Sequence, residues 1–475
     1  MTRPKYLNRA WGLLAALLLL AAPAPAFAQN LLIRNARLLD GTGAPPRGPV
    51  SILIRDGRIA AIGQVADEPN LLTLDVAGAT ELPGLIDSHV HVSVVPGSAI
   101  RKDSPEELRE QRLQQLRGYL ACGVTTVLDA GIEPAIAREL MAALAADAVG
   151  PTVLYLGAPL AAPDGYLSIG HIVKSPAQVS KEFDVVQAIG GVGIKVILES
   201  GWSPFGSLGS HKPEIRRAIV QEAARRKLPI YAHASSEPDY EEALDLGAHA
   251  LMHGLLYRDT KLSRKFVARM AKSGAYQVST LSSMDSLRIE FEPERLDGPI
   301  TQTVVPARQL ATARDPRSGR IQAEHRVATV AGWLPPPARR VAANMNFSNR
   351  AISEAVASAR RALAAELRAG VPIVAGSESG GESIVPYLFH GPTTLREIEL
   401  LGGAGLSPAG AIEAATRTPA RMLGLSTEIG TVEPGKRADL MIVGGDPLTD
   451  LRALRKVLWT VKNGVARTPS EWMAR

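Results

Sequence analysis

The sequence predicts an α/β protein: a (β/α)8 TIM barrel with a small β-sandwich domain formed by both ends of the chain. Through the middle of the 475 residues, short apolar runs of β character alternate with helical patterns, which favours parallel strands joined by helices. Short strand-like segments also occur near both ends, in 29–80 and 428–475. We expect these two pieces to form one composite domain, which leaves 81–427 for the barrel.

The first 28 residues have the layout of a secretory signal peptide. Three basic residues precede the apolar run 13–22, and Ala26-Phe27-Ala28 follows as a small-x-small cleavage signal. The apolar run is short for a membrane span, although an uncleaved anchor helix is the alternative reading. We therefore expect cleavage before Gln29 and a periplasmic or secreted protein that has no membrane segment after processing.

The terminal pieces contain strand and hairpin signals. Residues 31–36 and 50–55 are apolar runs of β character, and the second meets Asp56-Gly57, a two-residue hairpin turn. Near the other end, 439–443 and 457–462 are also apolar runs of β character. The two pieces together predict the small β-domain.

Eight apolar runs of β character are predicted to form the barrel. A helix is expected after the first of them, because Ser104 can cap a helix that has Pro105 at its first position and Glu107 three residues after the cap. The segment from about 282 to 350 interrupts the alternation with prolines and arginines, and we interpret it as an insertion that forms a lid over the barrel mouth. The first run ends at His91, and the others are 124–128, 152–156, 194–198, 229–233, 250–253, 276–280 and 372–375.

Charge and cysteine content exclude two classes of protein. The formal net charge of +6 falls to +3 without the signal segment, which holds three basic and no acidic residues. The basic residues are dispersed rather than clustered in a stripe, so we expect no nucleic-acid partner. Cys122 is the single cysteine, which excludes an internal disulfide, and its place at a predicted helix end indicates a small packed residue.

Polar residues gather where five of the predicted strands end. Barrel enzymes place their chemistry at the carboxyl ends of the strands. Each residue also has a structural reading: a histidine can be hydrogen-bonded in the core, a lysine can extend to solvent, and a glutamate can be a solvated loop acid. The joint pattern predicts a metal site, since imidazole and carboxylate are metal ligands. The residues are His89, His91, Lys195, His233, His253 and Glu378.

Several motifs resemble the amidohydrolase superfamily, in particular its imidazolonepropionase-like and prolidase-like branch. The resemblance covers nearly the whole predicted mature chain. It is carried by the strand 83–91, by Ala232-His233 with His253 twenty residues later, and by the glycine-rich turn 376–380. The most specific part is the tail, where Ala-Ala-Thr-Arg-Thr-Pro-Ala and Gly-Thr-Val-Glu-Pro-Gly-Lys-Arg-Ala-Asp-Leu occur.

This resemblance implies a centre of one or two divalent ions, with zinc as the first expectation. His89 and His91 would bind the more buried ion, and His233 and His253 the more exposed one. Lys195, carbamylated by carbon dioxide, would bridge both. The family activates a water that attacks a carbonyl group. Its last ligand is an aspartate that also moves the proton, and this chain has Glu378 at that position.

Two further residues are pocket candidates. His171 follows the third strand and either hydrogen-bonds the scissile carbonyl as a catalytic residue or caps a loop. Tyr231 lies two residues before His233 on the same strand face, and it either meets a substrate carboxylate or packs.

The predicted function is metal-dependent hydrolysis of an amide or peptide bond in a small substrate, such as a dipeptide or an N-acyl amino acid. One alternative is a hydrolase of cyclic amides, lactones, carbamates or phosphotriesters. A second is a non-hydrolytic metal-binding relative or an isomerase. We expect small-molecule partners only, and the sequence leaves open whether the chain is a homo-oligomer.

Overall fold

The computed structural model describes residues 30–66, 71–146, 149–165, 170–200, 208–255 and 261–474. The predicted signal segment 1–28 lies outside these residues. Among the described residues, none of the helices has both the length and the apolar character that a membrane span requires.

Eight parallel strands form the predicted barrel, in two hydrogen-bonded sheets. One sheet has the order β6-β7-β8, and the other runs β10-β9-β11-β12-β13-β14-β15. Two contacts join them into a closed wall: the amide of Val192 donates to the carbonyl of Tyr155 at 2.9 Å, and Val90 forms a parallel bridge with Ser379. The barrel strands are β6 (Leu85–Val90), β7 (Val124–Asp129), β8 (Thr152–Tyr155), β11 (Ile194–Ile197), β12 (Ile230–His233), β13 (Ala250–Met252), β14 (Tyr276–Ser279) and β15 (Ile373–Ala375), with β9 (Leu160–Ala161) and β10 (His171–Ile172) beside them.

Each barrel strand is followed by a helix that packs on the outside. The predicted cap of the first helix is confirmed, because the Ser104 hydroxyl accepts from the Glu107 amide at 3.3 Å and the Glu107 carboxylate accepts from the Ser104 amide at 2.8 Å. Cys122 caps the far end of this helix and is fully buried, as predicted, and burial raises the pKa of its thiol. The eight helices are α3 (Pro105–Ala121), α4 (Pro134–Ala145), α5 (Pro176–Ala188), α6 (Pro213–Arg226), α7 (Glu237–Asp245), α8 (Arg264–Ser273), α14 (Asn349–Arg368) and α15 (Pro392–Gly403).

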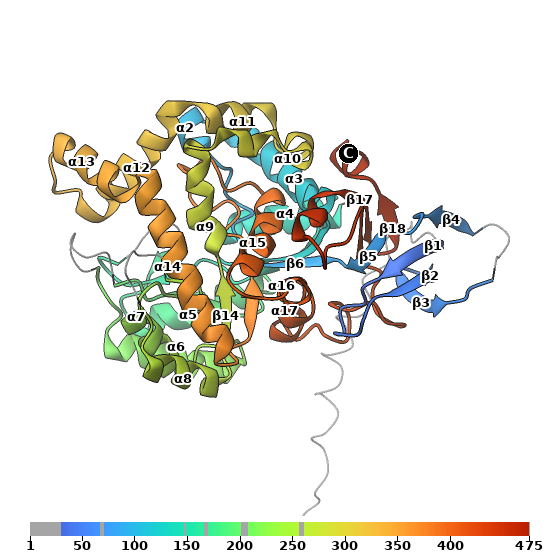
Figure 1. Ribbon diagram of the computed structural model, residues 1–475. Helices are drawn as coiled ribbons and strands as arrows, with labels where there is room; N and C mark the ends of the chain where they lie inside the picture. Colours follow the sequence, from blue (N-terminus) through green and yellow to red (C-terminus); the bar gives the residue numbers. More distant parts are fainter. Residues whose placement is uncertain are drawn as a thin grey trace, which may run out of the picture.

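The two ends of the chain meet in one eight-stranded sheet, of order β18-β17-β16-β5-β1-β2-β3 with β4 paired to β1. The turn at Asp56-Gly57 joins β2 to β3 with both residues at positive φ, as the hairpin signal predicts. In Figure 1 the blue N-terminal strands and the red C-terminal strands lie together beside the barrel. The strands are β1 (Leu31–Leu38), β2 (Arg47–Arg55), β3 (Arg58–Gly63), β4 (Leu72–Asp75), β5 (Thr80–Pro83), β16 (Leu440–Val443), β17 (Val457–Lys462) and β18 (Val465–Arg467).

A single glycine connects this terminal sheet to the barrel strand that carries the first two histidines. Gly84 lies between β5 and β6, and a Cβ there would clash with the side chain of Thr125. Its amide donates to the carbonyl of Asp439 at 2.8 Å. The buried Lys462 ammonium donates to Asp439 at 2.9 Å and to the Thr125 carbonyl at 3.0 Å. The terminal sheet therefore fixes the start of β6.

The predicted insertion is helical, and its Leu310, Val327 and Phe347 belong to an apolar cluster that it shares with the barrel helix that follows it and with the segment 385–389. In Figure 1 the gold helices α12 and α13 lie at the end of the molecule away from the terminal sheet. Arg308 anchors the insertion, with ion pairs of 2.6 Å to Asp103 and 2.8 Å to Glu107. A lid function stays a prediction. The insertion comprises α9 (Leu281–Asp285), η1 (Ser286–Glu290), η2 (Pro293–Asp297), α10 (Pro299–Val304), α11 (Ala307–Arg314), α12 (Pro316–Ala331) and α13 (Pro336–Asn346). The remaining helices are α2 (Ser98–Arg101), α16 (Pro408–Glu413), α17 (Arg417–Met422), η3 (Leu451–Arg455) and α18 (Pro469–Met473).

Candidate metal centre

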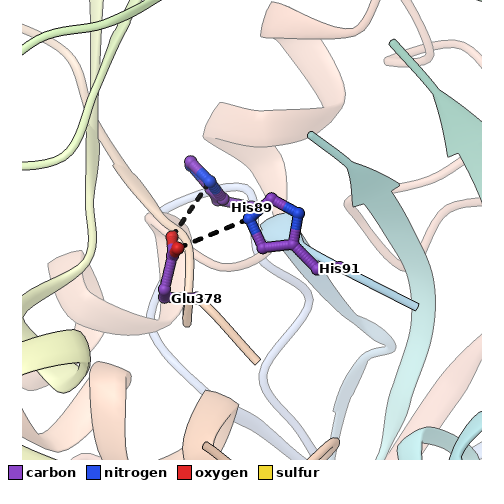
Figure 2. Close-up of side chains that lie close together, drawn as sticks. All are labelled: His89, His91 and Glu378. Atoms are coloured by element: carbon purple, nitrogen blue, oxygen red, sulfur yellow. Dashed lines mark ion pairs between the residues drawn. The ribbon is translucent and has the colours of Figure 1, made fainter. Parts of the chain in front are cut away.

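Two histidines at the end of β6 face a glutamate from the turn after β15. The Glu378 carboxylate has its Oε2 atom 3.0 Å from His89 Nε2 and its Oε1 atom 3.4 Å from His91 Nε2. One ligand-capable atom from each of the three residues lies within 4.8 Å of the other two. Figure 2 shows the two imidazoles and the carboxylate pointing toward one another. The three residues thus form one compact cluster of potential metal ligands.

The backbone holds Glu378 in this position. Its φ of +58° lies in the left-handed region, which a residue with a side chain seldom adopts unless its surroundings enforce it. The amide of Ser377 donates to the buried Asp87 carboxylate at 2.9 Å, and the amide of His91 donates to the Ser379 carbonyl at 2.8 Å. A Cβ at Gly376 would lie 2.7 Å from that of His89, so the turn needs glycine to approach β6 this closely.

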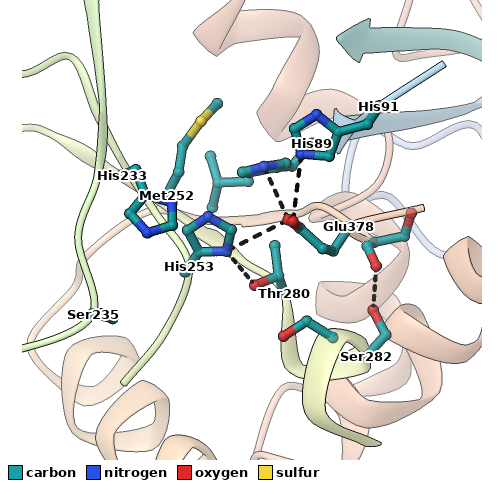
Figure 3. Close-up of polar contacts among 12 residues, drawn as sticks. His89, His91, His233, Ser235, Met252, His253, Thr280, Ser282 and Glu378 are labelled. Carbon is teal, nitrogen blue, oxygen red and sulfur yellow. Dashed lines mark hydrogen bonds and ion pairs between the residues drawn. The ribbon is translucent and has the colours of Figure 1, made fainter. Parts of the chain in front are cut away.

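His233 and His253 extend the cluster along the next strand ends. His253 follows β13 with a φ of +76°, and its Nδ1 lies 3.5 Å from Glu378 Oε2 and 3.0 Å from the Thr280 hydroxyl. The His253 ring is 4.5 Å from the His89 ring and 4.4 Å from the His233 ring, measured between centroids. Figure 3 shows these rings side by side around Glu378. All four predicted histidines therefore meet at the carboxyl ends of the barrel strands.

Lys195 projects into the same interior from β11. It is buried, and its ammonium nitrogen donates to the Met252 sulfur at 2.9 Å. Burial lowers its pKa to about 7, although Glu378 and Asp129 favour the charged form. A lysine that loses its proton near neutral pH is nucleophilic, which is the form that reacts with carbon dioxide.

The pKa shifts of His89, His253 and Glu378 suit cation binding, whereas the adjacent Glu378 raises the pKa of His91. Burial lowers the pKa of His89 to about 3 and lowers that of His253 as well, which keeps both imidazoles neutral near neutral pH. Burial alone would raise the pKa of Glu378, but the adjacent His89, His253 and His91 hold it well below its usual value. Neutral imidazoles and an ionised carboxylate are the forms that bind metal ions.

The cluster also contains polar atoms that a cation would satisfy. In the described part of the chain, the buried atoms His89 Nε2 and Glu378 Oε2 lie 3.0 Å apart without hydrogen-bond geometry, and the buried His89 Nδ1 has no hydrogen-bond partner. Buried polar atoms without partners are costly and rare in folded proteins. Three or more nitrogen and oxygen donors that converge in this way fit a divalent ion such as zinc. We conclude that the residues present suit the predicted metal.

His171 does not lie with this cluster. Its Nδ1 is 2.9 Å from Glu182 and its Nε2 is 3.3 Å from Glu133, so carboxylates from the α5 and α4 regions take both ring nitrogens. Burial alone would lower the pKa of His171, but Glu182 and Glu133 raise it. These contacts favour the structural alternative for His171, and a contact with the scissile carbonyl stays a prediction.

Tyr231 also lies elsewhere. It points into the barrel on the same face as His233, as predicted, but packs in an apolar layer with Leu128 and Val278. Its ring centroid is 5.7 Å from that of His249, the residue before β13. Two residues along a strand correspond to about 6.6 Å, which is one layer of the barrel interior. The packing alternative for Tyr231 is therefore favoured, and a contact with a substrate carboxylate stays a prediction.

Two buried acids near the cluster escaped the sequence analysis. Asp129 ends β7 and accepts from the amides of Val92 at 2.7 Å and Gly131 at 2.8 Å, which fixes the backbone that follows His91. Glu199 comes two residues after β11, and its Oε2 lies 3.4 Å from His233 Nε2. Both acids directly follow an apolar run of β character, which is the sequence signal that points to them.

Comparisons with known proteins agree with this geometry. The profile of the amidohydrolase family matches residues 80–467. An N-acyl-D-aspartate deacylase from Alcaligenes xylosoxydans xylosoxydans is 43% identical over 70 residues, which are 15% of this chain and 13% of the deacylase. A D-hydantoinase from Geobacillus stearothermophilus is 32% identical over 101 residues, which are 21% of this chain and 19% of the hydantoinase. The matched segments thus span a small part of these relatives.

Over its whole length, one solved structure shares the fold of this chain. The crystal structure of a Xaa-Pro dipeptidase with methionine bound in its active site superposes with a TM-score of 0.68. The alignment covers 93% of this chain and 100% of the dipeptidase, at 21% sequence identity. At this identity the likeness concerns the fold.

Proposed function

The chain belongs to the amidohydrolase family, and on that premise we propose that it is an exported, metal-dependent hydrolase of amide or peptide bonds in small substrates. The observation that carries the proposal is the buried cluster of His89, His91 and Glu378, which His253 adjoins. The family match over most of the chain supports the reaction class. Export is inferred from the signal-like segment 1–28 alone.

Six residues would hold the ions: His89, His91, Lys195 as a carbamate, His233, His253 and Glu378. When bound, a divalent ion such as zinc lowers the pKa of a water molecule and polarises a carbonyl group. Glu378 accepts the proton of the attacking water, because its carboxylate is ionised and faces the ligand cluster. The same carboxyl group then returns the proton to the leaving nitrogen.

We propose a dipeptide or an N-acyl amino acid as the substrate. Support comes from the deacylase and dipeptidase relatives, each of which is named for an amide or peptide bond next to an amino acid. A cyclic amide is the second candidate, favoured by the match to a D-hydantoinase. Both candidates are compatible with the same cluster, since the metal site acts on the carbonyl group and not on the ring.

The test uses purified mature protein loaded with zinc and a panel of dipeptides, N-acyl amino acids and cyclic amides. We expect one to two ions per chain and turnover of at least one substrate class. A chelator should abolish both, and His89→Ala should lose most of the metal with the activity. Full activity in metal-free protein would overturn the proposal, while bound metal without turnover of any class would favour a non-hydrolytic relative.

A further inference from the structure

Glu199 and His233 are placed beside each other by strand pairing. Strands β11 and β12 run parallel, with Ile197 opposite His233 at their carboxyl ends. The amide of Leu198 then donates to the carbonyl of His233 at 2.9 Å. This bond extends the pairing one residue beyond β11, and Glu199 follows directly. Its side chain is 3% exposed.

The Glu199 carboxylate faces two potential donors from the β12 end. Its Oε2 atom lies 3.4 Å from His233 Nε2 and accepts a hydrogen bond from the Ser235 hydroxyl. A buried carboxylate is stable only where donors surround it. An ionised carboxylate offers acceptors alone, so the imidazole nitrogen beside it is most stable when it carries a proton.

We propose that Glu199 is a positioning residue that holds His233 in the tautomer with Nε2 protonated, so that His233 offers Nδ1 to the more exposed metal ion. This inference rests on the metal centre of the proposed function and concerns how that centre binds the more exposed ion. Metal-binding histidines commonly donate their other ring N–H to a carboxylate or a carbonyl, which fixes the tautomer and the ring orientation.

His91 has a similar arrangement at the more buried ion, but there the acceptor faces the other ring nitrogen. His91 has Nδ1 at 3.3 Å from the carbonyl of Gly131, and its Nε2 faces Glu378. A backbone carbonyl thus orients His91 so that Nε2 points to the cluster. At His233 the acceptor is Glu199, and it faces Nε2 instead. The two histidines would therefore bind through different nitrogens, because their acceptors lie on different sides of the rings.

The experiment titrates metal-free protein with zinc alone, then with cobalt, and compares the parent with Glu199→Gln and Glu199→Met. Both substitutions are close in size to glutamate. Glutamine keeps a side-chain oxygen that can accept from Nε2, and methionine does not. We expect Glu199→Met to weaken the second ion by about 10–100-fold, which is typical for loss of such a partner, and to leave the first ion unchanged. Glu199→Gln should lose much less affinity, and its cobalt absorption spectrum should match that of the parent.

Parental binding of the second ion in Glu199→Met would overturn the inference. An equal loss in both variants would also overturn it, because it would indicate that Glu199 is itself a ligand. Thermal unfolding of the metal-free variants serves as the control for folding. A parent that binds only one ion would overturn the inference as well, and a parent that binds no metal would overturn the proposed function instead, so the two failures are distinguishable.

Discussion

Glu378 is joined to His89 through both its backbone and its side chain. The Glu378 amide donates to the His89 carbonyl at 2.8 Å, and the Glu378 carboxylate lies 3.0 Å from His89 Nε2. The turn after β15 and the end of β6 therefore form one unit. A change in the length of the Glu378 side chain has to be absorbed by the cluster itself, since the backbone on both sides is fixed.

Glu378→Gln should lower turnover by about 10²–10⁴-fold, the usual effect of losing a general base. Glutamine keeps the size of the side chain but cannot accept the proton of the attacking water. The measurement is kcat on the best substrate from the panel, together with metal content and the circular dichroism spectrum, which should show that the fold and much of the metal persist. Unchanged turnover would mean that another group takes the proton, and Glu382 would be the next acid to test.

The Glu378→Asp variant tests whether the site requires the longer glutamate side chain or merely tolerates it. The shorter arm withdraws the carboxylate from His89 and His91 while the backbone stays in place. If the site is fitted to glutamate, kcat should also fall in this variant, because catalytic groups need placement within about 0.5 Å. Activity that holds or rises would contradict this expectation and would indicate that the site merely tolerates the longer side chain.

Lys195 should make metal uptake depend on dissolved carbon dioxide. Its amine is buried with a pKa of about 7, so a neutral fraction is available to form a carbamate. Metal-free protein reloaded with zinc should take up more metal with bicarbonate than in carbon-dioxide-depleted buffer, as measured by metal analysis. Lys195→Arg keeps a cation that cannot be carbamylated, and its uptake should be the same in both buffers. A parent protein that is indifferent to bicarbonate would rule out the carbamate.

His171→Gln should reduce stability in acid and leave catalysis unchanged. Glu182 and Glu133 raise the pKa of His171 above its ordinary 6.5, so the stability that this group adds is fully present below about pH 6.5 and is lost as the pH rises through the folded-state pKa. The pair is partly exposed, so we expect a loss of less than about 1 kcal/mol. Urea unfolding at about pH 5.5 and pH 9 measures it, and a large fall in kcat would instead restore a catalytic role for His171.

Export should remove the first 28 residues. N-terminal sequencing of the protein from its native host should begin at Gln29, because Ala26-Phe27-Ala28 is the cleavage signal. The mature protein should be found outside the cytoplasm. Recovery of chains that begin at Met1 in the cytoplasm would contradict the prediction.

The alternation of strand-like and helical patterns predicted most of the fold. The polar residues in and after the strands predicted most of the candidate metal centre. All eight barrel strands occur where apolar runs predict them; β6, β12 and β13 bring His89, His233 and His253 to one end, and Lys195 projects into the same interior from within β11. This works because side-chain direction along a strand has a period of two and parallel strands end at a common edge. The sequence therefore contained the candidate ligands and their order along the chain.

Tertiary structure decided how deep each side chain lies and which groups it faces. Tyr231 is on the predicted face but one layer below the cluster, and His171 lies in β10 with partners from α5 and from the start of α4. Glu199 faces His233 only because β11 and β12 end in register. Periodicity specifies the direction of a side chain, whereas depth and partners depend on strand register, layer and loop path, which arise from packing between segments far apart in the chain.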